Sequence, residues 1–519
     1  MSPMRAVSPK SLPYARRFIA SIVVAAFVAA AALPGVAAAQ ELRVVVVPGL
    51  EPGDLAALTD RGAIGLLVPD AGPKTSAARS RAALERGAVR NSILGGLPAG
   101  RSLLEIETAA AVPTGPAIVL ALPQGGEQPN DRRYPVAVLA EGYRGLLTSD
   151  STRIPGLVSI VDVAPTALGV DGALGSEPDN DPLSTLADLD DRIESNRDAK
   201  ATVLLLSLAL IVAVAVFLPA AVLPAFAAVL VANLALGAAG VTEVWAEALV
   251  LALSVGASLT LARAGPLAQG LLMTEVLGAY LVAMVVDERW VALSPLGPTQ
   301  NARFYGLSNL LATLLLVPAL AGAVLLGRRF GMWGFVGVAA LSIVTVGGSS
   351  FGADGGGAIV LLAAFLILAV LEHGFSRRLA IGGAVVLAVL ALALAVGSSS
   401  HVTDALADGP VGLVEDLGRR LRLSFERATS GLGVALLVFG GIAAFVALGL
   451  RERRPLLLTL LAALGVSLLV NDSPNDVVVA GLACYLVLSS APGLARPATG
   501  RELLDPREPP ARIDPAASP

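Results

Sequence analysis

The feature that most constrains this chain is its second half, where apolar runs long enough to cross a bilayer follow one another from Ala201 onward. The chain has 519 residues, of which 55% are hydrophobic and 15% charged, and its mean hydropathy is +0.74. This composition is far more apolar than that of a soluble protein. The runs on either side of Pro219 and Pro224 could also form one broken helix. We expect an α-helical polytopic membrane domain over 201–490 with about eleven spans: 201–218, 220–237, 244–262, 267–286, 307–326, 332–348, 356–372, 379–397, 431–449, 455–470 and 476–490.

The distribution of arginine predicts which ends of these spans face the cytoplasm. If Lys200 lies outside, every predicted inner segment after the short turn at Pro219 carries arginine, as the positive-inside rule requires. One predicted outer segment, 401–427, also contains several arginines. Its apolar residues have helical spacing, which predicts an amphipathic helix. This helix either lies on the outer leaflet with its arginines at lipid phosphates, or covers the protein.

The first 200 residues have a different pattern. Residues 1–40 combine basic residues, an apolar stretch and small residues, which predicts a secretory signal peptide or an uncleaved N-terminal anchor. Residues 41–176 predict an exported α/β domain with strands at 42–47, 64–68, 117–122 and 136–140 and helices at 55–61, 75–86 and 159–168. Residues 177–200 predict an acidic linker with few apolar side chains, and 491–519 a disordered cytoplasmic tail.

Two stretches of the exported domain resemble the alkaline-phosphatase superfamily, which includes sulfatases and phosphoglycerol transferases. Residues 44–50 resemble its first strand and the turn that follows, and 146–168 (LLTSDSTRIPGLVSIVDVAPTAL) resembles its closing segment. The resemblance implies an alkaline-phosphatase-like core. For active members it also implies hydrolysis of phosphate or sulfate esters by one or two divalent metals, held by Asp and His, with a Thr or Ser nucleophile.

The metal ligands that such chemistry needs are missing from residues 41–200. Pro48 stands where the resemblance implies an acid after the first strand. The only histidines of the chain, His373 and His401, belong to the membrane half. A metal pair that clamps the reacting oxygens needs several ligands. The sequence therefore predicts a non-catalytic domain that holds no metal and no cofactor.

The hydroxyl and carboxyl groups of this domain lead to the same prediction. Thr75, Ser76 and Ser151 are the nucleophiles that could be proposed, but a hydroxyl without a base or metal nearby is not activated. We expect Asp150 to be a loop cap and Asp162 to be an acid on a helix surface. No catalytic residue is expected in the chain.

Three polar stretches interrupt the membrane half, at 294–309, 351–357 and 471–476, and the predicted topology places all three on the outer side. Their sequences RFYGLSN, GAD and ND resemble a family of bacterial membrane proteins that have an alkaline-phosphatase-like outer domain; Leu310 stands where that family has an acid. We take as candidate ligand-binding residues Arg303, Tyr305, Asn309, Asp354, Asn471 and Asp472.

These six residues have chemistry that suits an anionic, hydroxyl-rich ligand. The planar fork of Arg303 suits phosphate or carboxylate. Asp354, Asn471 and Asp472 could orient the hydroxyls of a sugar. Alternatively, Arg303 and Tyr305 are interfacial anchors, and Asp354 pairs with Arg303 for structural reasons.

The remaining charges of the membrane half lie mostly near the ends of spans. We expect Glu243, Glu247 and the pair Asp287–Glu288 to be solvated. Glu275 lies deep enough to be a proton or partner site. The single cysteine, Cys484, is expected to be a small packing residue.

The sequence excludes two classes of function. A net charge of -4 gives the chain no dense basic face for nucleic acid. No phosphate-binding G-x-x-x-x-G-K-[ST] loop occurs, which argues against an ATP-driven pump. We therefore expect a cell-envelope, multi-pass protein of the cell membrane that binds, translocates or helps assemble an anionic lipid or lipid-linked glycan at the outer leaflet. The alternatives are a membrane-embedded transferase or hydrolase that uses Asp354, Asp472 and Arg303, and a scaffold for envelope protein partners.

Overall fold

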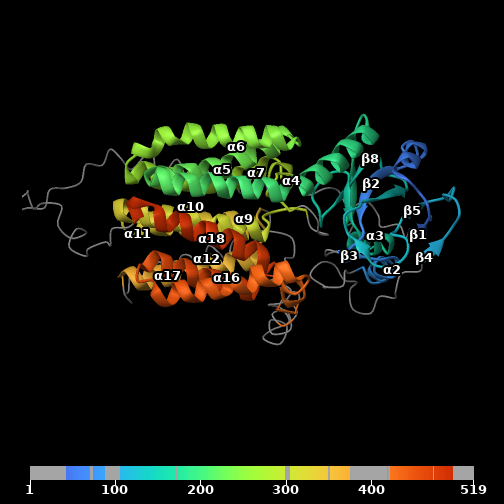
Figure 1. Ribbon diagram of the computed structural model, residues 1–519. Coiled ribbons are helices and arrows are strands. Elements are labelled where there is room, and N and C mark those ends of the chain that lie inside the picture. Colours follow the sequence, from blue (N-terminus) through green and yellow to red (C-terminus); the bar gives the residue numbers. More distant parts are fainter. Residues whose placement is uncertain are drawn as a thin grey trace, which may run out of the picture.

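The structure, a computed structural model, consists of an N-terminal α/β region and a bundle of long apolar helices (Figure 1). It describes residues 42–70, 74–87, 106–169, 173–298, 304–348, 351–373, 418, 421–422, 424–471 and 473–494. The expected signal segment 1–40, the span 379–397 and the tail from 495 onward lie outside these residues. The described residues confirm the expected order of an α/β region followed by a mostly helical domain.

The α/β region is built on one mixed sheet with the strand order β10-β8-β2-β7-β5-β1-β4, in which β9 also pairs with β2. Strand β1 is parallel to β4 and β5, whereas β7 is antiparallel to both β5 and β2. The strands are β1 (Arg43–Val46), β2 (Ala63–Val68), β4 (Ile106–Thr108), β5 (Ala117–Leu120), β7 (Tyr134–Leu139), β8 (Gly145–Ser149), β9 (Leu157–Ser159) and β10 (Leu174–Glu177). A separate two-stranded sheet pairs β3 (Lys74–Thr75) with β6 (Gln128–Pro129).

Both faces of the sheet are buried, which explains why β1 is apolar from Val44 onward. Val44 and Val46 point into one core, with α2 (Ala77–Arg86) and α3 (Val163–Ala167). Val45 points into the other core, with the 3-10 helix Pro52–Leu58 and the first half of α4 (Pro182–Phe217). Successive side chains of a strand point to opposite faces, so burial on both sides requires a continuous apolar run.

Most elements expected in this region are present, with shifted boundaries. The four expected strands are β1, β2, β5 and β7, and α2 begins at the N-cap Ser76 and ends at Gly87, which has the left-handed φ of 61°. The helix expected at 55–61 is the 3-10 helix Pro52–Leu58. The helix expected at 159–168 is a 3-10 turn, Ile160–Asp162, followed by α3, so the break comes before Pro165. Strands β4, β8, β9 and β10 were not predicted.

Helix α4 joins the two parts without interruption (Figure 1). It is 36 residues long and begins at Pro182, behind the N-cap Asp181. The segment 177–200 was expected to be a linker with few apolar side chains to anchor a core, but Leu186, Leu189 and Ile193 are buried against the sheet. These residues recur every three to four positions and form one helical stripe, while the acids occupy the other faces.

The bundle contains seven described helices that are long and apolar enough to cross a membrane, which indicates a membrane-spanning protein. They are Pro182–Phe217, Pro219–Ala239, Val244–Arg263, Pro266–Val286, Asn309–Phe330, Gly355–Glu372 and Leu432–Arg451. Three shorter apolar helices are α11 (Met332–Gly347), α17 (Pro455–Val470) and α18 (Pro474–Ser490). The runs around Pro219 and Pro224 form two helices, α4 and α5 (Val222–Ala239), joined by a 3-10 turn.

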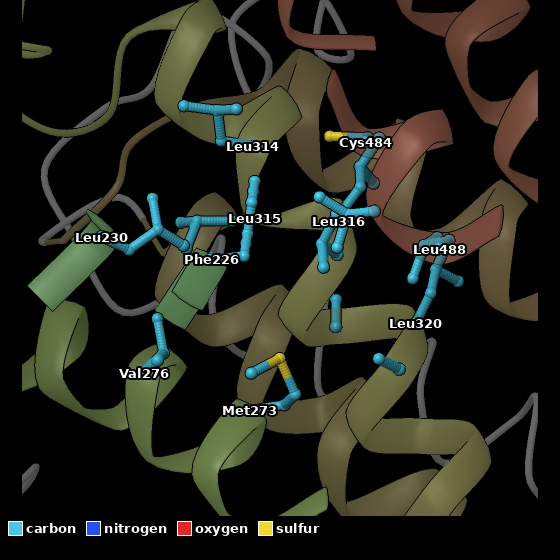
Figure 2. Packing of buried hydrophobic residues seen from close by; sticks show 14 of the residues in the cluster. Phe226, Leu230, Met273, Val276, Leu314, Leu315, Leu316, Leu320, Cys484 and Leu488 are labelled. Carbon is cyan, nitrogen blue, oxygen red and sulfur yellow. The ribbon is translucent and has the colours of Figure 1, made fainter. Parts of the chain in front are cut away.

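The core of the bundle lies where α5, α7 (Pro266–Val286), α9 (Asn309–Leu314), α10 (Leu316–Phe330) and α18 meet, and Figure 2 shows part of it. Phe226, Leu315 and Met273 pack there with Cys484. Cys484 is fully buried and its thiol lies 3.3 Å from the carbonyl oxygen of Thr313. Cys484 is therefore a packing residue of the bundle core, as expected.

Candidate functional site

The structure brings the three polar stretches of the membrane half together at the end of the bundle that faces the α/β region. The first two meet directly, because the Leu307 amide donates to the carbonyl oxygen of Gly352 at 3.0 Å. Gly306 has a φ of +71°, and a Cβ there would collide with the same carbonyl. Only glycine fits this position without strain.

The second and third stretches meet at the N-terminus of α12 (Gly355–His373). Asp354 caps this helix, since its Oδ1 accepts from the Gly357 amide at 2.9 Å. A Cβ on Gly356 would lie 2.5 Å from Oδ1 of Asn471, so the start of α12 packs closely against that amide. Asn471 in turn donates from Nδ2 to the Ser467 hydroxyl at 2.8 Å.

A small cavity lies between α9, α12 and α17, and its polar side chains come from α9 and from α17 with its C-cap Asn471. Thr313 follows Asn309 by one turn on α9, and its hydroxyl donates to the Asn309 carbonyl at 2.7 Å. Asp354 and Asn471 are 8% and 4% exposed. Of the six candidate residues, Asn471 lines this cavity, and Asn309 and Asp354 are hydrogen-bonded to its lining residues Thr313 and Gly357. Its lining residues are Ala312, Thr313, Leu316, Gly357, Val360, Ser467 and Asn471.

Tyr305 lies elsewhere, at the junction with the α/β region. Its ring stacks under the guanidinium of Arg153, whose central carbon lies 4.0 Å from the ring centroid. Arg153 also pairs with Glu288 at 3.1 Å. The other two candidates, Arg303 and Asp472, lie outside the described residues, so the proposed pairing of Arg303 with Asp354 stays a prediction.

The arginine-rich segment before α16 (Leu432–Arg451) contacts the same site. Its described residues 424–428 are helical. The Ser424 hydroxyl donates to the Asn471 carbonyl at 2.8 Å, and Arg427 donates to the Ser473 hydroxyl at 2.7 Å. Phe425, in contrast, is 63% exposed. The helix thus covers the third polar stretch with one face and exposes an apolar residue on another.

A larger, apolar groove lies nearby and was not found from the sequence. It lies between α4, α5, α9 and α18, and its empty space, open solvent included, is about 420 Å³. Three of its residues, Phe226, Leu230 and Leu314, appear in Figure 2. The groove is lined by Leu204, Ser207, Leu208, Ile211, Phe226, Val229, Leu230, Leu296, Leu314, Val479 and Ala483.

A lysine stands above one end of this groove. Lys200 precedes Leu204 by one turn of α4, and its ammonium donates to the Gly297 carbonyl at 3.1 Å. Among the described residues, Asp476 at the start of α18 interacts electrostatically with Lys200. The sequence contains a pattern that could have indicated this groove, because Lys200, Leu204 and Ser207 have the spacing of one helix face.

A buried polar network holds this end of the groove in place. Asn233 of α5 donates to the Ser294 hydroxyl at 2.9 Å and accepts from the Leu296 amide at 2.9 Å. Its amide also donates to the hydroxyl of Tyr280, which is fully buried in α7. Buried polar groups are stable only when their hydrogen bonds are satisfied. This network therefore fixes the loop that carries Gly297 beneath Lys200.

Two acids that were expected to be solvated are buried. Asp162 is 5% exposed and accepts hydrogen bonds from the hydroxyls of Ser149 and Ser151, the second at 2.7 Å. Burial raises the pKa of Asp162 to about 6, although these hydrogen bonds lower it. Glu247, in the first turn of α6 (Val244–Ser258), is fully buried, and neither carboxylate oxygen has a partner among the described residues. The prediction of surface positions was wrong because both residues lie on the packed face of their helix.

The hydroxyls considered as nucleophiles have structural partners. Thr75 and Ser80 share a hydrogen bond of 3.0 Å, and Ser76 caps α2 by accepting from the Arg79 amide. The Ser151 hydroxyl donates to Asp162. Within the residues that the structure describes, no group of three or more His, Cys, Asp or Glu is arranged to hold a metal ion. The absence of catalysis in this region stays a prediction.

Comparison with known proteins adds no relative to this picture. No family model matches the chain, and neither a curated protein nor a solved structure matches it. The resemblances to the alkaline-phosphatase superfamily and to a family of bacterial membrane proteins therefore remain predictions from the quoted residues.

Proposed function

We propose that this protein binds an anionic lipid, or a lipid-linked glycan, at the end of its bundle next to the α/β region, and that it translocates the lipid or helps assemble it into the cell envelope. In this proposal the protein is a multi-pass protein of the cell membrane and the α/β region is extracytoplasmic. That region acts as a binding module and performs no chemistry.

The observation that carries the proposal is the position of Lys200 above the apolar groove. The groove offers hydrocarbon contacts to an acyl chain along α4 and α18. Lys200 offers a cation at its end. An apolar tail and an anionic head are the two parts of an anionic lipid, and long basic side chains near helix ends commonly reach the headgroup level.

The polar cavity around Asp354 and Asn471 supports the glycan version of the proposal. Its hydroxyl and amide groups are those of Thr313, Ser467 and Asn471, and they can both donate and accept hydrogen bonds. Such groups suit the hydroxyls of a sugar. The segment that contains Ser424 and Arg427 covers this stretch and adds donors to it.

Mass spectrometry of the lipids that copurify with the intact protein tests the proposal. We expect a defined anionic lipid with the unmodified chain, and at least a fivefold loss of it in Lys200→Gln and in Leu208→Trp, which would fill the groove. Arg451→Gln, an exposed cation near the far end of α16, is the matched control and should retain the lipid. Arg303→Ala tests whether that candidate adds to the headgroup site.

Bulk phospholipid in equal amounts from all variants would exclude a specific lipid site at the groove. The scaffold function would then be favoured. If Leu208→Trp loses the lipid and Lys200→Gln retains it, the groove binds an apolar tail and Lys200 does not bind the headgroup.

A further inference from the structure

A carboxylate faces outward from the middle of α7. Helix α7 spans Pro266–Val286, so Glu275 lies about 14 Å along the helix axis from its first residue and about 17 Å from its last. Its side chain is exposed. No residue that the structure describes donates a hydrogen bond to Glu275 or pairs with it. In a bilayer this position lies in hydrocarbon, where an unpaired carboxylate is costly, and its side chain is too short to reach the headgroups.

The surface around Glu275 is shaped for a second helix. Leu271 and Val282, one and two turns away on the same face, are 45% and 57% exposed. A Cβ on Gly278 would meet no atom within 4 Å, so the backbone is open to a neighbour there. The opposite face of α7 packs into the bundle through residues such as Met273 and Tyr280. Small residues beside a polar one are typical of contacts between membrane helices.

We propose that this face of α7, formed by Leu267, Leu271, Glu275, Gly278, Val282 and Val285, binds a transmembrane helix of another membrane protein, and that this helix carries a Lys, Arg or His near the bilayer centre. The basic side chain pairs with Glu275, and Gly278 lets the two backbones approach. Charge complementarity identifies the partner's chemistry, because the hydrocarbon of a lipid offers no cation at this depth.

A second copy of this chain does not provide that cation. Among the described spans, the basic residues lie at helix ends, as Arg263, Arg328 and Arg451 do, or in the part of α4 before its apolar half, as Lys200 does. The remaining expected span, 379–397, contains no basic residue. A symmetric pair of copies that met through this face would place two acids together, which is unfavourable.

Photocrosslinking in the native membrane tests this inference. A photoreactive phenylalanine analogue replaces Leu271 in the full chain, and the crosslinked peptide is sequenced. We expect one protein adduct, within a transmembrane segment that has a basic residue near its centre. Its yield should fall at least tenfold with Glu275→Leu and persist with Glu275→Asp. The same analogue at Leu253, which is 63% exposed on α6, should give lipid adducts only.

A charge exchange makes the test specific. Glu275→Lys should abolish the adduct, and changing the partner's basic residue to Glu should restore it. Glu275 has no described partner within the chain, so its substitutions should leave folding unchanged, which size-exclusion chromatography checks. An adduct with a second copy, adducts with lipid alone, or a protein adduct of equal yield in Glu275→Leu would each overturn the inference.

Discussion

The guanidinium of Arg153 lies 4.0 Å above the ring of Tyr305, and this contact ties the α/β region to the loop that leads into α9. The same side chain pairs with Glu288, just after α7. The backbone of Arg153 has a φ of +55°, which few residues other than glycine adopt. The turn after β8 therefore holds an unfavourable conformation at the position where its side chain reaches the bundle.

Arg153→Ala should loosen this junction. The ion pair is partly buried, with side chains 24% and 16% exposed, so we expect a coupling free energy between Arg153 and Glu288 of about 1 kcal/mol. A double-mutant cycle with Glu288→Gln, measured by hydrogen exchange in α8 (Arg289–Ala292), determines it. The exposed pair Arg81–Glu85 within α2 is the control, and its coupling should be about 0.3 kcal/mol. Equal couplings for both pairs would refute a special role for Arg153.

Asp162 should make the stability of the α/β region depend on pH. Burial raises its pKa from 3.8 to about 6, so the folded state binds the proton more tightly than the unfolded state does. The contribution of Asp162 to stability is therefore fully present below about pH 4 and is lost as the pH rises through about 6, by about 3 kcal/mol in total. Asp162→Asn cannot ionise and should remove this dependence.

Hydrogen exchange of the β8 and β9 amides in the full chain, corrected for the intrinsic rate at each pH, measures the effect of Asp162. Asp188→Asn, which changes an exposed acid on α4, is the control. A pH dependence that persists unchanged in Asp162→Asn would assign it to another group.

Gly306→Ala should destabilise the contact between the first two polar stretches. The new Cβ meets the Gly352 carbonyl, and the φ of +71° is unfavourable for alanine. We expect a loss of at least about 1 kcal/mol, seen as a lower thermal midpoint in detergent. Gly465→Ala, in the interior of α17, meets no atom within 4 Å and should be neutral or slightly stabilising. Similar midpoints for the two variants would show that the loops adjust without cost.

Glu247→Leu should stabilise the bundle. The carboxylate is fully buried without a partner among the described residues, and burying an unpaired polar group costs about 1–3 kcal/mol. Leucine fills a similar volume without that cost, so the thermal midpoint should rise. Glu243→Leu, at an exposed position one turn earlier, should have little effect. A lower midpoint in Glu247→Leu would indicate that the carboxylate has a stabilising partner.

The sequence alone determined the elements whose pattern depends on local burial. The continuous valines of β1 predicted a strand buried on both faces, and the long apolar runs predicted the membrane helices, because each pattern follows from the solvent around one element. The polar stretches at 294–309, 351–357 and 471–476 were predicted to lie on the same side of the membrane, and their described parts contact one another through Leu307, Gly356 and Asn471.

Only the tertiary structure decided which face of each helix is covered. Asp162 and Glu247 have sequences typical of solvated acids, yet both are buried, while Glu275 stays exposed at mid-span. The role of α4 as one rigid connection and the position of Lys200 above the groove depend on contacts with Leu293 and Gly297, about a hundred residues away. Local sequence sets the propensity and polarity of a segment, but burial depends on the neighbours that the fold brings to it, and these are distant along the chain.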